Sequence, residues 1–69
     1  RKILLHQALK RIKPEYSQVI YLTFFEGFTN SETAGIMKKN NRQIENLIYR
    51  AKKALRKELE REGFTYENI

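Results

Sequence analysis

The chain has 69 residues, too few for more than one domain or for an enzyme with a deep substrate pocket. It contains no cysteine and a single histidine, His6, which argues against disulfides, the common zinc frameworks and cysteine-nucleophile chemistry, so we expect no metal or other cofactor. No apolar run approaches the roughly 18 residues that cross a bilayer and no signal peptide is present, so we expect a cytoplasmic protein without a membrane partner.

Two helical patterns occupy the first part of the chain. The first covers about Lys2 to Ile12, with apolar residues at helical spacing. Pro14 suits the first turn of a second helix, where its missing N–H costs nothing, and Gly27 fits the left-handed position just past the end of that helix. We therefore expect the second helix to run to about Glu26.

The second helix carries many apolar residues. We expect Val19, Leu22 and Phe25 on its inner face, with further apolar surface from Ile20, Tyr21, Phe24 and Phe28. The three phenylalanines are most simply assigned to the core. Any of them that a small core cannot hold would form an exposed aromatic patch, which is typical of a surface that docks another protein.

A capping signal predicts a short third helix. Thr29 and Glu32 fit a capping box, in which the threonine hydroxyl accepts from the backbone of Glu32 and the glutamate reaches back to the threonine N–H. We expect this helix to run to about Lys38.

A second signal of the same kind starts a long fourth helix. Asn40 can cap it and Gln43 can answer three positions on, and we expect the helix to run to about Glu62 and to be closed by Gly63. The tail from 64 to 69 gives no clear signal. Two capped helices joined by a tight turn form the helix-turn-helix pattern, in which the second helix lies in the major groove of DNA.

The fourth helix has two distinct faces. On a wheel of about 3.6 residues per turn, one broad apolar stripe is assigned to the core: Ile44, Leu47, Ile48, Ala51, Ala54, Leu55 and Leu59. The opposite face carries polar and basic residues: Arg42, Asn46, Tyr49, Lys53, Arg56 and Lys57. That face has the chemistry of a major-groove reader, since Arg can bond guanine, Asn can bond adenine, and Tyr offers a hydroxyl and a flat ring to a thymine methyl.

Basic charge is concentrated on the same stretch. Between residues 38 and 57 one acid, Glu45, stands among basic residues: Lys38, Lys39, Arg42, Arg50, Lys52, Lys53, Arg56 and Lys57. We expect the N-terminal half of the helix to read bases, and the basic residues further along to contact phosphates: Arg50, Lys52, Lys53 and Arg56. The alternative is an ordinary solvated face held by Glu–Lys pairs, for which Glu45, Glu58 and Glu60 are the available acids.

From Ile12 to Leu59 the chain resembles region 4 of bacterial sigma factors of the sigma-70 family, in particular the extracytoplasmic-function group. The resemblance is carried, in chain order, by Ile12, Pro14, Val19 and Leu22, by Glu26-Gly27, by Glu32-Thr33-Ala34, and by the run from Gln43 to Leu55. The ending Tyr-Arg-Ala-Lys-Lys-Ala-Leu is the most distinctive part. Each segment is weak alone, and their shared order and spacing make the resemblance specific.

The resemblance implies an all-α four-helix domain, winged-helix-like or of the sigma region 4 type, with its helix-turn-helix from about Thr29 to Ala54. It implies sequence-specific binding of double-stranded promoter DNA at the minus-35 element, so that RNA polymerase initiates transcription there. It also implies the polymerase core, through its β flap, and an anti-sigma factor as protein partners. We expect residues 1–69 to form one domain, the C-terminal part of a longer chain, without enzymatic activity.

Position by position, the resemblance implies contacts to bases or the nearby backbone from Arg42, Glu45, Asn46, Tyr49 and Arg50. It places Thr29 and Glu32 near phosphates, and the basic residues Lys39, Lys53 and Arg56 complete the predicted DNA-binding set.

The sequence departs from the family pattern at several positions. Thr33 stands where the family usually has Ile, and Lys38 where it often has Gly. Arg42-Gln43 replaces a common Gly-Thr, and Glu45 and Leu47 stand where basic residues are frequent. These changes bear on the promoter sequence that is read rather than on the fold.

Three other functions stay open. A stand-alone regulator or phage protein would use the same domain without docking to polymerase. A pure interaction module, held by an anti-sigma factor, would use the apolar and basic surfaces without DNA. A small enzyme is the weakest alternative, because no nucleophile, base and orienting group can be assembled, and His6 has no partner for such a role.

Overall fold

The structure, a computed structural model, describes residues 2–61, and every regular element in that part of the chain is helical. The elements are α1 (Lys2–Arg11), α2 (Pro14–Ile20), the π-helix η1 (Tyr21–Phe25), α3 (Asn30–Met37) and α4 (Asn41–Arg61). Because η1 continues directly from α2, the elements form four helical units, and the all-α prediction is confirmed. The predicted end of the fourth helix at Glu62 and Gly63, and the tail from 64 to 69, lie outside the described residues.

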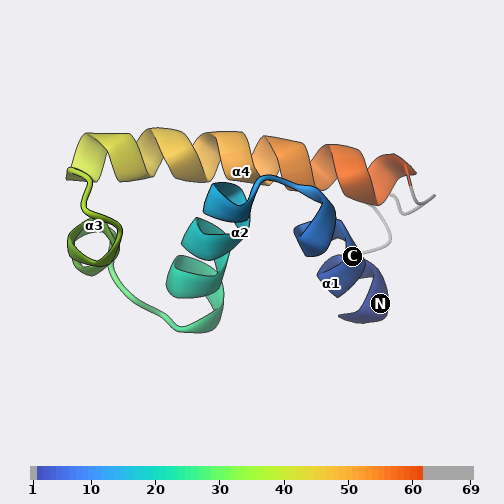
Figure 1. Cartoon of the computed structure of the whole chain (residues 1–69), viewed down its shortest axis with the longest axis horizontal. Helices are drawn as coiled ribbons and strands as arrows, with labels where there is room; N and C mark the ends of the chain where they lie inside the picture. The colour runs from blue at the N-terminus through green and yellow to red at the C-terminus, as the bar shows by residue number, and fades with distance from the viewer. Residues whose placement is uncertain (1, 62–69) are drawn as a thin grey trace.

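The long helix α4 forms one side of the domain, and α1, α2 and α3 all pack against the same side of it (Figure 1). The core lies between them, and its buried cluster is Leu9, Ile12, Val19, Ile20, Ala34, Ile44, Leu47 and Ala51. The predicted apolar stripe of α4 is confirmed, since each of its members is buried or half-buried. The opposite side of α4 therefore faces away from the other helices.

The junction between α1 and α2 is tight. α1 ends at Arg11, one residue before the predicted end, and Ile12 turns into the core. Pro14 is the first residue of α2, as predicted. The hydroxyl of Ser17 donates a hydrogen bond to the carbonyl of Leu9, which ties the start of α2 to α1.

The second helix widens into a π turn that the sequence reading missed. The N–H of Glu26 donates to the carbonyl of Tyr21 at 2.8 Å, five residues back, where an α-helix would bond four residues back. The wider turn changes the phase of the helix. Phe25 was predicted on the inner face and is instead 50% exposed. Ile20, predicted only as further apolar surface, ends α2 just before the π turn and is buried at 4% exposure. Gly27 follows with φ 77°, in the left-handed region predicted for it.

Both predicted capping boxes are confirmed. The N–H of Glu32 donates to the Thr29 hydroxyl at 3.1 Å, and the N–H of Thr29 donates to the Glu32 carboxylate at 2.8 Å. At the start of α4 the N–H of Gln43 donates to the side-chain oxygen of Asn40 at 2.8 Å, and the N–H of Asn40 donates to the amide oxygen of Gln43 at 2.9 Å.

The turn between α3 and α4 begins with Lys38 in the left-handed conformation, at φ 58°. This is the position where the resemblance expects glycine, which adopts that conformation without a steric penalty. The side-chain amide of Asn41 then donates to the hydroxyl of Ser31 at 3.1 Å, so the two helices of the motif are also linked directly.

Candidate nucleic-acid interface

The outer face of α4 carries most of the predicted DNA-binding residues. All seven that lie on this helix are exposed: Arg42, Glu45, Asn46, Tyr49, Arg50, Lys53 and Arg56. Tyr49 is 69% exposed, whereas Ile44 and Ala51 on the opposite face are fully buried. Exposed tyrosine, asparagine and arginine side chains on one helix face can each contact base edges in the major groove.

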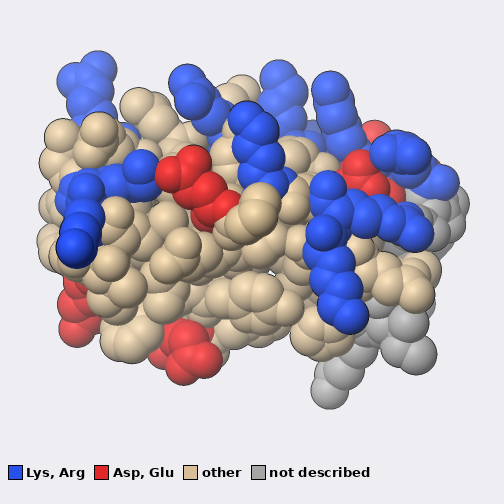
Figure 2. Space-filling view, in the orientation of Figure 1, with Lys and Arg blue, Asp and Glu red and all other residues tan. Residues whose placement is uncertain are grey.

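Positive charge follows this face. Lys and Arg side chains project along the edge of the molecule that α4 forms, while fewer Asp and Glu side chains interrupt them (Figures 1 and 2). A cationic ridge along one helix is the electrostatic pattern expected of a surface that approaches the DNA backbone.

The predicted residues gather around two shallow hollows along α4. The first, of about 220 Å³, is lined by Glu15, Lys39, Gln43, Asn46, Leu47 and Arg50. The second, of about 250 Å³, is lined by Tyr49, Lys52, Lys53 and Arg56. Of the predicted residues within 2–61, Arg42, Glu45 and Thr29 line neither hollow. Arg42 and Glu45 are exposed on the first turns of α4, and Thr29 lies at the start of α3.

Two residues that are predicted to contact DNA already interact with other residues of the domain. The hydroxyl of Thr29 accepts the capping hydrogen bond from Glu32, so any phosphate contact from this residue would share an oxygen that already caps α3. The ammonium of Lys39 lies 2.9 Å from the carboxylate of Glu15. Glu15 was missed by the sequence reading, because it lies on α2, far from the helix-turn-helix in the chain, and only the packing of α2 against α4 brings it there.

Lys52 lines the second hollow with Tyr49, Lys53 and Arg56, and it also contacts an aromatic ring. It was expected to contact phosphates with its neighbours, and its ammonium lies 4.9 Å from the centre of the Phe24 ring, within cation–π distance. Lys52 therefore faces the aromatic surface of the domain as well as the basic ridge.

The aromatic residues of η1 and the loop after it form a second exposed surface. Phe24 is 55% exposed, Phe25 50% and Phe28 37%, so their simple assignment to the core was wrong. Tyr21 stacks against Phe25 with ring centres 5.1 Å apart. An open groove of about 290 Å³ lies beside them between α1, α2 with η1, and α4, lined by Leu5, Ile20, Phe24, Phe25, Lys52, Leu55, Arg56 and Leu59. The lining of this groove is mostly apolar, with Lys52 and Arg56 as its basic residues, which suits a protein partner.

Two negative findings apply to the described part of the chain. Among residues 2–61, no group of His, Cys, Asp and Glu side chains could hold a metal ion. None of the helices described there is long and apolar enough to cross a membrane.

Comparison with protein families shows which family the chain belongs to. The model of the family described as Sigma-70, region 4 matches residues 2–55, which is more than half of the chain. The chain belongs to the sigma-70 region 4 family. The match spans α1 to most of α4, and it contains every predicted DNA-binding residue except Arg56.

Two sigma factors resemble this region 4 domain in sequence. The ECF RNA polymerase sigma factor BldN of Streptomyces coelicolor is 38% identical over 48 residues, which cover 70% of this chain and 18% of BldN. The RNA polymerase sigma factor SigV of Bacillus subtilis is 36% identical over 61 residues, which cover 88% of this chain and 37% of SigV. The chain thus spans less than two fifths of either relative. No solved structure matches it.

Proposed function

We propose that this region 4 domain binds the minus-35 element of a promoter by inserting the N-terminal half of α4 into the major groove. The observation that carries the proposal is the exposed, basic outer face of the second helix in a helix-turn-helix. In that motif the second helix enters the groove while the first crosses the backbone. Promoter binding of this kind would direct RNA polymerase to its start site in the cytoplasm.

The exposed side chains divide into two roles. Arg42, Asn46 and Tyr49 have the donors, acceptors and apolar face that distinguish base pairs, and Glu45 can accept from the amino group of a cytosine. The basic residues would contact phosphates and fix the register of the helix, with little sequence preference of their own: Lys39, Arg50, Lys53 and Arg56.

Selection from a randomised duplex pool at low salt tests this assignment. We expect the domain to enrich one short motif. Asn46→Ala should relax the preference within that motif, at a cost of about 1–3 kcal/mol for the preferred site. Lys53→Ala should weaken binding to all sequences alike and reduce the salt dependence by about one phosphate contact. If no motif is enriched and both variants bind as the wild type does, α4 is not a reader.

The groove beside η1 supports a second part of the proposal, docking of the polymerase β flap. An aromatic surface exposed by a π turn, next to an apolar groove with Lys52 and Arg56 at its rim, is suited to an apolar segment of another protein. Docking there would leave the N-terminal half of the outer face of α4, with Arg42, Asn46 and Tyr49, available for DNA. An anti-sigma factor that covers the same groove would compete with the flap.

Binding to a purified β-flap fragment, followed by fluorescence, tests the docking proposal. Phe25→Ser should weaken binding by about tenfold or more, because truncating an aromatic anchor removes a large share of an interface's binding energy. The matched control is Ile36→Ser, which removes another exposed apolar side chain, 48% exposed and outside the groove. Equal effects of the two variants, or no flap binding at all, would exclude this docking site.

A further inference from the structure

The first of the two hollows, at the start of α4, contains one acidic side chain beside several hydrogen-bond donors. Of its lining residues, Lys39 and Arg50 are cationic and Asn46 is a predicted base reader, whereas Glu15 is a carboxylate from a different helix. A carboxylate in that position presents to these groups the same kind of acceptor oxygen that a DNA phosphate would present.

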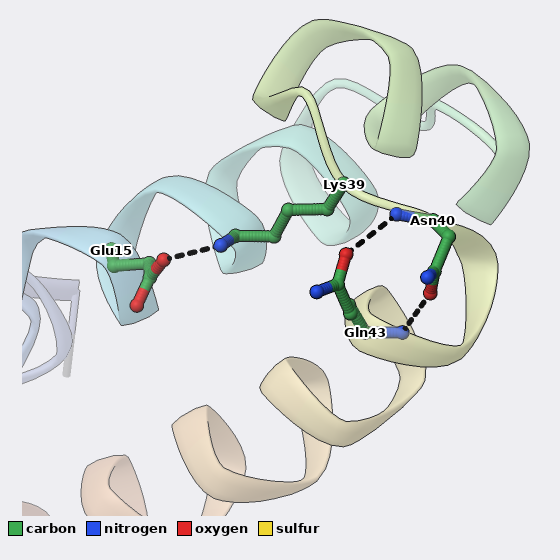
Figure 3. Close-up of polar contacts among 4 residues, drawn as sticks. All are labelled: Glu15, Lys39, Asn40 and Gln43. Carbon is green, nitrogen blue, oxygen red and sulfur yellow. Dashed lines mark hydrogen bonds and ion pairs between the residues drawn. The ribbon is translucent and has the colours of Figure 1, made fainter.

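The contact of Glu15 is directed at the helix-turn-helix turn. Figure 3 shows Lys39 reaching from the turn to α2, where its ammonium lies 2.9 Å from the Glu15 carboxylate. The side chain of Lys39 is 28% exposed and that of Glu15 is 47% exposed. Solvent therefore reaches the pair, and a flexible lysine stem can carry the ammonium from one anion to another.

The ion pair is not needed to build the turn. Asn40 and Gln43 already satisfy each other through two reciprocal hydrogen bonds of 2.9 and 2.8 Å at the start of α4 (Figure 3). The amide of Asn41 is bonded to Ser31, which links α3 and α4 independently of Glu15. The position of the turn is thus fixed by capping, and the effect left for Glu15 is electrostatic.

We propose that Glu15 is an internal competitor for DNA phosphate: it holds Lys39 in the free domain, and a backbone phosphate takes its place when DNA is bound. The proposal rests on the DNA-binding function proposed above. Binding must break the ion pair, and the released carboxylate then repels the backbone. Glu15 lowers affinity for every sequence alike, so it weakens binding to non-promoter DNA while the ratio of affinities, which base contacts set, is unchanged.

The test measures the affinity of the domain for a short duplex of random sequence as a function of salt, by fluorescence anisotropy. Glu15→Gln keeps the shape of the side chain and removes its charge. We expect it to bind about two- to fivefold more tightly at low salt, the range for releasing an exposed ion pair. We also expect its plot of log affinity against log salt to be steeper by up to about 0.9, the value for one ion, because in the wild type the Glu15 carboxylate released on binding takes up a cation.

Two further variants separate this mechanism from a general change in charge. Glu26→Gln removes the same charge from an exposed residue at the far end of the α2–η1 segment, and should change affinity and slope less. Lys39→Gln should abolish the gain when combined with Glu15→Gln. A thermal melt of each variant verifies that the domain remains folded.

The outcomes distinguish this inference from the function on which it rests. Tighter binding and a steeper slope for Glu15→Gln, both lost in the double variant, support the competitor role. If the wild type binds duplex DNA but Glu15→Gln behaves as Glu26→Gln does, or the gain persists without Lys39, the competitor role is wrong and DNA binding stands. If the wild type shows no salt-dependent binding to any duplex, both proposals are overturned.

Discussion

Thr33 is the clearest local conflict between a side chain and its surroundings. It is fully buried in α3, and within residues 2–61 its hydroxyl has no hydrogen-bond partner. A buried polar group without a partner costs free energy that an apolar group of similar shape does not. Sigma region 4 usually has Ile at this position, so the sequence indicated an unusual residue there. It did not show that the Thr33 hydroxyl is buried.

Replacing Thr33 by valine should therefore stabilise the domain. We expect Thr33→Val to raise the free energy of unfolding by about 1 kcal/mol, measured by thermal or urea denaturation. Thr23→Val is the matched control, because the Thr23 hydroxyl donates to the carbonyl of Val19 at 2.7 Å and its loss should give no gain. A destabilised Thr33→Val protein would mean that the hydroxyl is satisfied in solution.

At the scale of elements, the close packing of α3 against α4 depends on a small side chain. Ala34 is 6% exposed and belongs to the core cluster between the two helices. Its neighbour Gly35 is exposed, and a Cβ added there would meet nothing within 4 Å. A larger side chain should therefore destabilise the domain at Ala34 and should not do so at the adjacent Gly35.

Ala34→Leu should lower the free energy of unfolding by about 1–3 kcal/mol, because the larger side chain overpacks the crossing. Gly35→Ala should instead raise it by about 0.5–1 kcal/mol, since alanine suits a helix interior better than glycine. Denaturation of the two variants checks both signs. A stable Ala34→Leu protein would contradict the crossing of α3 and α4 described above.

The elements themselves were largely predictable, because their signals are local. Pro14, Gly27 and the two capping boxes act within a few residues, and each was confirmed. The π turn was not predictable from the same rules, because the helical wheel assumes about 3.6 residues per turn throughout. A wider turn therefore shifts the predicted face of every later residue in the helix. That single change of phase moved Phe25 out of the core.

At the scale of the whole molecule, α4 serves two surfaces at once. Its outer face presents the predicted DNA-binding residues, and its C-terminal half lines the aromatic groove with Leu55 and Leu59. The helical wheel predicted the outer face, because exposure follows directly from the apolar stripe. The contacts of Glu15 with Lys39 and of Lys52 with Phe24 join distant parts of the chain, so no local pattern could predict them.

We expect the outer face of α4 to contact DNA and the aromatic side chains of the groove, Phe24 and Phe25, to remain free of it. The most direct test follows backbone amide NMR signals of the domain while a duplex carrying the enriched motif is added. We expect the largest shifts in the turn before α4 and in the first half of that helix, around Asn46 and Tyr49, with little change at Phe24 and Phe25. If the largest shifts instead fall on the groove, or no signals move at a saturating concentration of DNA, the account of this domain as a major-groove reader is wrong.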